Sequence, residues 1–97
     1  MPTYIVLGKY TKEGITDIKN SPQRVEQAKK LATSRGGAIK EFYYTMGRYD
    51  FVAVVEATGN EGMLESLFII GSGGAVMTET LVAIPLEKGV EIFKKMP

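Results

Sequence analysis

Four segments of the chain carry the short apolar runs and alternating side chains that are typical of β-strands. They are rich in Val, Ile, Tyr and Phe, which favour a pleated backbone. The predicted strands cover residues 4–10, 38–46, 49–57 and 75–84. Gly47 and Arg48 separate the second strand from the third, so these two strands are predicted to form a tight hairpin.

Three other segments are predicted to be helical from apolar residues at helical spacing. The first begins at Ser21-Pro22, where serine would cap free N–H groups and proline fits the first turn, and it ends at Gly36-Gly37. The others cover residues 60–70 and 86–95, and residues 11–20 are interpreted as a polar loop.

Local signals at the second helix predict its start and its inward face. Thr58 with Glu61 is expected to form a capping box, with Asn60 as a competing cap. Four apolar residues are expected to face the sheet: Met63, Leu64, Leu67 and Phe68.

The order strand, helix, strand, strand, helix, strand is typical of the α+β, ferredoxin-like βαββαβ fold. It predicts a four-stranded antiparallel sheet with two helices on one face and a short C-terminal helix. We expect one domain over residues 1–97.

The strands are apolar on both faces, although two helices can cover only one. In the third strand Phe51, Ala53, Val55 and Ala57 share one face, while Val52 and Val54 lie on the other. An uncovered apolar face is sticky, so the sequence predicts at least a homodimer, packed sheet to sheet. The alternative is that Val52 and Val54 are simply β-formers on a solvated face.

Composition narrows the available chemistry. The 97 residues include no His, Cys or Trp, and the net charge is +1. These absences argue against zinc or iron–sulfur sites, a cysteine nucleophile, a His base and a Ser-His-Asp triad. We expect no cofactor and no metal. We also expect no nucleic-acid partner, because the sequence lacks an excess of basic residues. No apolar run approaches the roughly 18 residues of a membrane span, and without an export signal we expect a cytoplasmic protein.

The hairpin sequence Gly47-Arg48-Tyr49-Asp50 resembles the Gly-x-Tyr-Asp signature of the GYD domain family. Further similar positions are Gly14-Ile15, Lys19 to Arg24, Gly36-Gly37, Glu56 and Gly74 to Leu81. The resemblance implies a ferredoxin-like fold of the dimeric α/β-barrel type. It implies no established activity and no catalytic set.

Asp50 and Glu79 are the candidate catalytic residues. Asp50, one of two aspartates, would act as a base or anchor at a cavity mouth. The favoured alternative is a side-chain bond to backbone N–H groups of the hairpin. Glu79 shares a strand face with Met77 and Leu81, where a buried carboxylate would work as a general acid or base, but an interstrand ion pair or a charge at the sheet edge that blocks aggregation is the simpler interpretation.

The candidate ligand-binding residues are Tyr44, Tyr49 and Asp50 on the hairpin, with Arg24 near a helix start. Tyrosines can line an apolar pocket and orient a ligand through their hydroxyl groups, and arginine can bind an anion. The alternatives are ordinary sheet or dimer packing for the tyrosines and a solvated surface position for Arg24.

Two functions are compatible with these residues. The first is a non-catalytic oligomeric module that binds a small ligand or a protein partner. The alternative is a cofactor-independent enzyme, such as a monooxygenase, isomerase or decarboxylase, with Asp50 or Glu79 as the base. An enclosed pocket above about 300 Å³ with a carboxylate inside would favour the enzyme.

Overall fold

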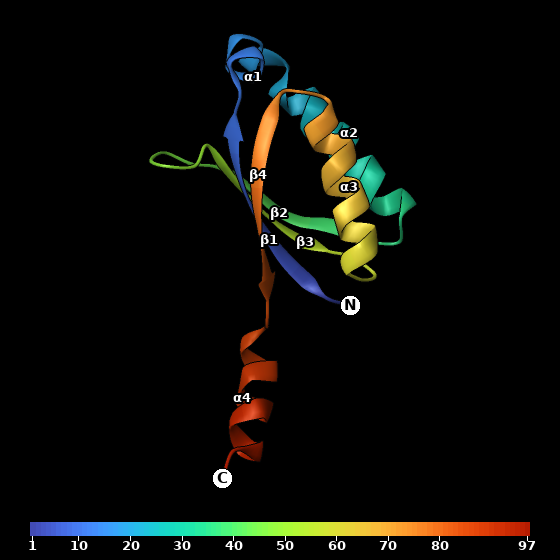
Figure 1. Ribbon diagram of the computed structural model, residues 1–97, viewed down its shortest axis with the longest axis vertical. Coiled ribbons are helices and arrows are strands. Elements are labelled where there is room, and N and C mark those ends of the chain that lie inside the picture. Colours follow the sequence, from blue (N-terminus) through green and yellow to red (C-terminus); the bar gives the residue numbers. More distant parts are fainter.

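The computed structural model describes all of residues 1–97 and shows a four-stranded antiparallel sheet with helices on one face (Figure 1). The elements in chain order are β1 (Thr3–Tyr10), α1 (Lys12–Thr16), the short 3-10 helix η1 (Ile18–Asn20), α2 (Ser21–Ser34), β2 (Ala38–Tyr44), β3 (Phe51–Glu56), α3 (Asn60–Ser72), β4 (Val76–Ala83) and α4 (Leu86–Lys95). The strand order is β2-β3-β1-β4, which confirms the predicted ferredoxin-like α+β arrangement.

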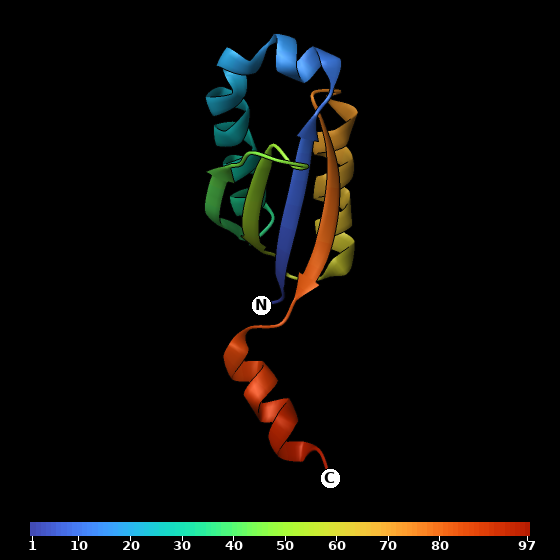
Figure 2. The same ribbon diagram turned by 90° about the vertical axis from the view of Figure 1, so that its left-hand side faces the viewer.

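The two long helices cover different parts of the same sheet face. Packing of α2 is mainly on β2, and packing of α3 is mainly on β4. Figure 2 looks onto the opposite face of the sheet, with α2 and α3 behind opposite sides of it. We call the face that carries no helix the open face. The helices therefore stand apart above the two central strands, β3 and β1.

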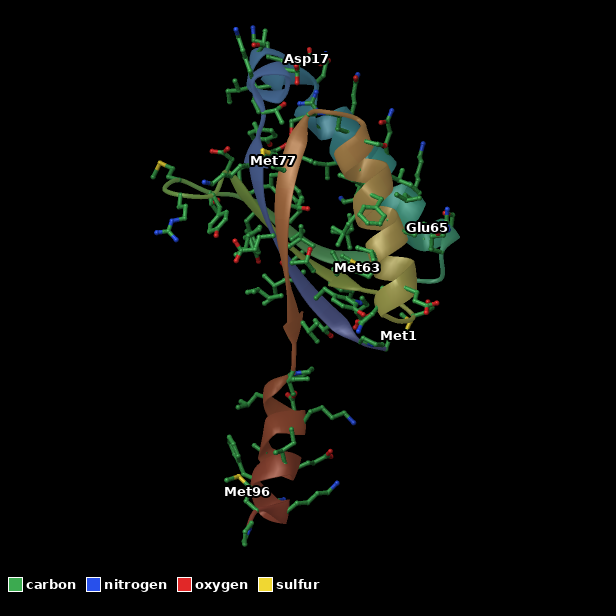
Figure 3. The ribbon with its side chains drawn as sticks, in the orientation of Figure 1. Met1, Asp17, Met63, Glu65, Met77 and Met96 are labelled. Carbon is green, nitrogen blue, oxygen red and sulfur yellow. The ribbon has the colours of Figure 1, made fainter.

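The core lies between the sheet and α3. Its buried apolar side chains are Tyr4, Val6, Phe51, Ala53, Val55 and Met63. The ring of Phe51 stacks on Phe42 with a centroid distance of 5.1 Å, and it lies over Gly8 of β1, where a Cβ would collide with it. Figure 3 shows Met63 beneath α3. Three of the four residues that the sequence placed together on one face of the third strand, Phe51, Ala53 and Val55, belong to this core.

The inward face of α3 was only partly predicted. Met63 is buried and Leu67 is half-buried, but Leu64 and Phe68 are 50% and 67% exposed. The predictions of inward Leu64 and Phe68 were wrong because this helix is apolar on more than one side, so helical spacing alone cannot identify its inner stripe.

The predicted caps of both long helices were also wrong. Gly59 precedes α3 without a side-chain capping bond, so Thr58 and Glu61 form no capping box. Asn60 does not act as a cap, because its Oδ1 accepts a hydrogen bond of 2.6 Å from the Tyr4 hydroxyl. Ser21 is the first residue of α2 rather than its cap, and its hydroxyl contacts two tyrosines instead.

Residues 11–20, predicted to be a loop, form α1 and η1 at one end of the sheet. The Thr11 hydroxyl accepts a hydrogen bond from the Gly14 amide and donates one of 2.5 Å to the Gly74 carbonyl. Gly14 is packed against the backbone of Ala75, so no larger residue fits there. Thr11 and Gly14 hold this turn in place through their contacts with Gly74 and Ala75, the residues just before β4. These contacts join positions about 60 residues apart, so the local sequence of residues 11–20 does not reveal them.

The hairpin between β2 and β3 is wider than predicted, because β2 ends earlier, at Tyr44, and β3 begins later, at Phe51. Residues 45–50 form its loop, which the Thr45 amide closes by donating a 2.9 Å hydrogen bond to the Asp50 carbonyl. Gly47 has a φ of 109°, which favours glycine at this position. The loop projects on the side of the open face (Figure 1).

The C-terminal helix α4 projects away from the body in both views (Figures 1 and 2), and Met96 lies at its far end (Figure 3). Its apolar residues lie on one side and are exposed: Leu86, Val90, Ile92, Phe93 and Met96. Its charged residues lie on the other side. No helix of the chain has the length and apolar character required to cross a bilayer.

Candidate functional site

The open face has an apolar centre built from the three strands β3, β1 and β4. Antiparallel pairing places Ile5 opposite Val54 on one side and opposite Leu81 on the other, and it places Leu7 opposite Val52. These side chains are half-buried or exposed, with Leu81 45% exposed. The structure confirms the alternation that puts apolar residues on both faces of the sheet, and no part of the chain covers this second set.

A polar rim borders this apolar centre, and it contains two of the candidate residues. The Tyr49 hydroxyl donates a 2.8 Å hydrogen bond to Glu79 Oε1, and Lys9 Nζ lies 5.7 Å from the centre of the Tyr49 ring. The hydrogen bond to Glu79 raises the pKa of Tyr49 above its ordinary value of 10.0. Glu79 therefore acts here as an acceptor for a neutral tyrosine on an exposed strand.

A similar pair lies on the β2 side of the open face. The Tyr43 hydroxyl donates a 2.6 Å hydrogen bond to Glu41, which raises the pKa of Tyr43. The rim of the open face therefore carries one tyrosine–glutamate hydrogen bond on each side.

Asp50 holds the hairpin loop against β1. Its Oδ2 accepts a 2.9 Å hydrogen bond from the Tyr10 amide, and its own amide donates a 2.7 Å bond to the Gly8 carbonyl. This is a structural contact of the kind favoured from the sequence, although the partner is β1 rather than the hairpin itself. Asp50 thus satisfies a backbone donor at the end of a central strand.

The largest hollow lies on the other face of the sheet, between α2 and α3. Its volume is about 370 Å³, and apolar side chains make up most of its lining. Residues from both helices and from the sheet contribute, among them Val6, Ala28, Leu31, Ala53, Leu67 and Val76. We call this hollow the helix cleft.

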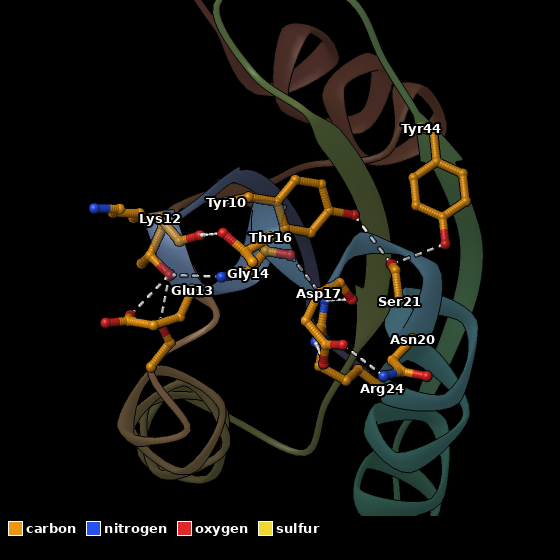
Figure 4. A network of polar contacts seen from close by, with 12 residues as sticks. Tyr10, Lys12, Glu13, Gly14, Thr16, Asp17, Asn20, Ser21, Arg24 and Tyr44 are labelled. Atoms are coloured by element: carbon orange, nitrogen blue, oxygen red, sulfur yellow. Dashed lines mark hydrogen bonds and ion pairs between the residues drawn. The ribbon is translucent and has the colours of Figure 1, made fainter.

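Three hydroxyl groups meet where α2 begins (Figure 4), and the Tyr44 hydroxyl belongs to a residue that is 56% exposed and lies outside the cleft lining. Ser21 Oγ lies 3.1 Å from the Tyr10 hydroxyl and 2.9 Å from the Tyr44 hydroxyl. Ser21 is 4% exposed and lines the cleft together with Tyr10. The sequence identified Tyr44 as a candidate but missed Ser21, whose partners lie 11 and 23 residues away along the chain.

Both arginines beside the helix cleft are already paired. Arg24 forms a 3.1 Å ion pair with Asp17 and donates to the carbonyls of Gly14 and Asp17 at 3.3 Å (Figure 4). Arg35 forms an ion pair with Glu65 of α3. Arg24 therefore joins α1 and the following residue, Asp17, to α2 instead of standing free in solvent.

The lining of the helix cleft is mostly apolar and carries few titratable groups. Glu56 is the acidic residue in its lining, but strand alternation directs its side chain to the open face, opposite Thr3 of β1. Neither Asp50 nor Glu79 lines the cleft. No group of three or more His, Cys, Asp or Glu residues is arranged to hold a metal ion.

The family assignment follows from the sequence comparison. The chain belongs to the GYD domain family, whose model matches residues 4–93. A curated relative from Thermus thermophilus is 36% identical over 87 residues, which cover 89% of this chain and 92% of the relative. That protein is named glutamine synthetase and cystathionine beta-lyase binding protein.

Solved structures share the fold. The Mycobacterium tuberculosis leucine response regulatory protein aligns with a TM-score of 0.65 and 14% identity over 87% of this chain, which spans about half (51%) of that protein. The protein FFRP-DM1 aligns with a TM-score of 0.60 and 23% identity, over 87% of this chain and all of that one. At these identities the likeness concerns the fold alone.

Proposed function

We propose that this protein is a non-catalytic binding module that recognises a partner protein and acts as at least a homodimer in the cytoplasm. The observation that carries the proposal is the relative that matches nine-tenths of both chains and is named for the enzymes it binds. Two exposed apolar surfaces of this chain, the open face and α4, supply the means of association.

We assign the open face to a second copy of the chain. Its centre is apolar across three adjacent strands, and its rim carries the tyrosine–glutamate pairs. Two such faces pack sheet to sheet around a two-fold axis and remove both apolar centres from water. The dimer then has two layers of sheet inside and helices outside.

We assign the exposed side of α4 to the partner protein. An isolated helix of 10 residues is marginal in water, and α4 stands away from the body, so its stability depends on docking. Its apolar residues follow helical spacing, as in segments that lie in a hydrophobic groove. Glutamine synthetase and cystathionine beta-lyase, the enzymes in the relative's name, are the first candidate partners.

Biolayer interferometry measures the binding of the purified 97-residue chain to glutamine synthetase and to cystathionine beta-lyase. Both enzymes are taken from the organism that encodes this chain. We expect saturable binding to at least one enzyme. Phe93→Asp should abolish it, because a carboxylate in the docked apolar side of α4 would be buried without a partner. Glu91→Ala, on the charged side of the same helix, is the matched control and should bind as the unmodified chain does.

Two results would contradict the proposal. One is the absence of binding to both enzymes. The other is equal binding by the Phe93→Asp variant, which would remove α4 from the interface. Sedimentation of Phe93→Asp as a dimer would show that the substitution acts on partner binding and leaves the open face intact.

The alternative of a cofactor-independent enzyme has less support. Its proposed bases, Asp50 and Glu79, lie outside the helix cleft, and both are engaged with other groups of the chain. A base needs a substrate within hydrogen-bond reach in a pocket.

A further inference from the structure

The helix cleft is a hollow that α2 and α3 leave unfilled where they pack on the sheet. Helices α2 and α3 each have a single buried residue, Ser21 and Met63, although both carry apolar side chains toward the sheet. The remaining inward residues, such as Val25 and Leu31, are only half-buried because they border a hollow. The hollow of about 370 Å³ is partly open to solvent, so these apolar side chains border a cleft that no other part of the chain fills.

Small side chains create this hollow where larger ones would close it. Ala28 and Ala32 line it from α2, Ala53 from β3, and Gly62 and Ser66 from α3. The volume falls within the range of small-molecule pockets, roughly 300 to 1,000 Å³.

The hydroxyl chain at the end of the cleft has unused hydrogen-bonding capacity. Tyr10, Ser21 and Tyr44 together carry three hydroxyl hydrogens but form two hydrogen bonds with one another. Tyr44 is 56% exposed and lies outside the cleft lining, so the capacity that a ligand in the cleft can use belongs to Tyr10 and Ser21, whose oxygens retain lone pairs. The chain can therefore donate a hydrogen bond to a ligand or accept one from it.

The cleft offers no free charge to a ligand. Arg24 is paired with Asp17, and Arg35 is paired with Glu65. The only acidic residue of the lining, Glu56, directs its side chain to the open face. A charged ligand would lose its hydration in an apolar pocket without gaining a counter-ion.

We propose that the helix cleft binds a small uncharged molecule with an apolar body and one hydroxyl or carbonyl group, which bonds to the hydroxyl of Tyr10 or Ser21. The body lies among the apolar side chains of α2, α3 and the sheet. The proposal rests on the face of the sheet that carries the helices and does not depend on the partner-binding function proposed above.

The test compares three probes with the same apolar body: 1-octanol, octanoate and octylammonium. Binding to the full-length chain is followed by amide chemical shifts in NMR titrations. We expect saturable binding of 1-octanol and binding at least about tenfold weaker for both charged probes. Ser21→Ala should weaken binding of 1-octanol about threefold to tenfold, as expected for the loss of one hydrogen bond.

Filling the cleft should abolish binding. Ala28→Phe places a ring in the hollow, whereas Lys30→Phe adds the same ring to an exposed position of the same helix and serves as the matched control. If circular dichroism shows that Ala28→Phe does not fold, Ser66→Leu fills the cleft from α3. Nuclear Overhauser contacts from the octanol chain to Val25 and Leu67 methyl groups locate the probe directly.

Three outcomes would overturn the proposal. They are no saturable binding of 1-octanol up to its solubility, equal binding of all three probes, and unchanged binding in a folded variant with a filled cleft. Loss of binding in Val54→Lys, with retention in Ala28→Phe, would place the probe on the open face and would also overturn it. None of these results bears on whether the enzymes in the relative's name bind.

Discussion

The two faces of the sheet carry similar side chains but have different surroundings. On the helix side, Val6, Ala53 and Val55 are buried beneath α2 and α3. On the open side, Ile5, Val52 and Val54 alternate with them along the same strands and have no cover within the chain. Strand alternation therefore specifies two apolar surfaces, and the two long helices cover only one of them.

The two faces also differ in shape. The helix side is hollow, because α2 and α3 cover opposite sides of the sheet and present small side chains to each other. The open side presents a broad apolar surface with a polar rim. A hollow suits a small molecule and a broad surface suits a second sheet, so the same four strands can support two kinds of binding.

The largest effect is expected from a charge in the middle of the open face. Val54→Lys would bury an ammonium group in the proposed sheet-to-sheet interface, so the dissociation constant of the dimer should rise at least about a hundredfold. Analytical ultracentrifugation measures it. Val82→Lys is the matched control, because Val82 lies on the other face of β4 and is 64% exposed. If both variants dissociate equally, the dimer interface is not specific to the open face, and the proposed contrast between the two faces is wrong.

A smaller effect is expected on the helix side from Gly8→Ala. The new Cβ would collide with the ring of Phe51, which is itself held by stacking on Phe42, so the core must shift. We expect a loss of about 2–3 kcal/mol in the free energy of unfolding by chemical denaturation.

The control for Gly8→Ala is Gly71→Ala in α3, where a Cβ meets no atom within 4 Å. Alanine favours the helix there, so we expect a gain of up to about 1 kcal/mol. A Gly8→Ala variant as stable as the unmodified chain would contradict the description of this core.

Removing the side chain of Asp50 should have an intermediate effect. Asp50→Ala leaves the Tyr10 amide without its acceptor and should lower the free energy of unfolding by about 1–2 kcal/mol. Asp50→Asn retains an acceptor oxygen and should lose less. If thermal denaturation shows both variants to be unchanged, Asp50 is not needed for the fold, and its role as a ligand or catalytic residue becomes the better interpretation.

The smallest effect is expected from the tyrosine–glutamate pairs of the rim. An unfolded tyrosine has a pKa of 10.0, and the hydrogen bond to Glu79 raises the pKa of Tyr49 in the folded chain. The folded chain thus retains this proton where the unfolded chain has lost it. The resulting stability is complete below about pH 10 and disappears as the pH rises through the raised pKa.

Absorbance titration of tyrosinate tests this prediction. The unmodified chain should contain a late-titrating component above pH 10, and Tyr49→Phe should remove part of it while leaving the rest, which includes Tyr43 with its own raised pKa. Tyrosines that all titrate together near pH 10 would contradict the two hydrogen bonds.

The sequence predicted the order of strands and helices along the chain and the two faces of the strands, because the underlying patterns are local. Val52 and Val54 could be assigned to one face and Phe51 and Val55 to the other without any tertiary information. The same reasoning failed in α3, where Leu64 and Phe68 belong to an apolar run that has no clear inner side.

The candidate site was less predictable because its contacts join distant positions. The Ser21-Pro22 sequence is typical of a helix N-cap, but the Ser21 hydroxyl forms hydrogen bonds with Tyr10 and Tyr44 instead of capping the helix. Asp50 meets the Tyr10 amide across 40 residues of sequence. The helix cleft depends on how far apart α2 and α3 stand, which no local pattern specifies.

The proposed function depends most on the open face being an interface between two copies of the chain. Sedimentation velocity of the unmodified protein at micromolar concentration tests this directly. We predict a single species with twice the 10.6 kDa mass of the chain. A species of 10.6 kDa under those conditions would show that the open face is solvated and would contradict the account.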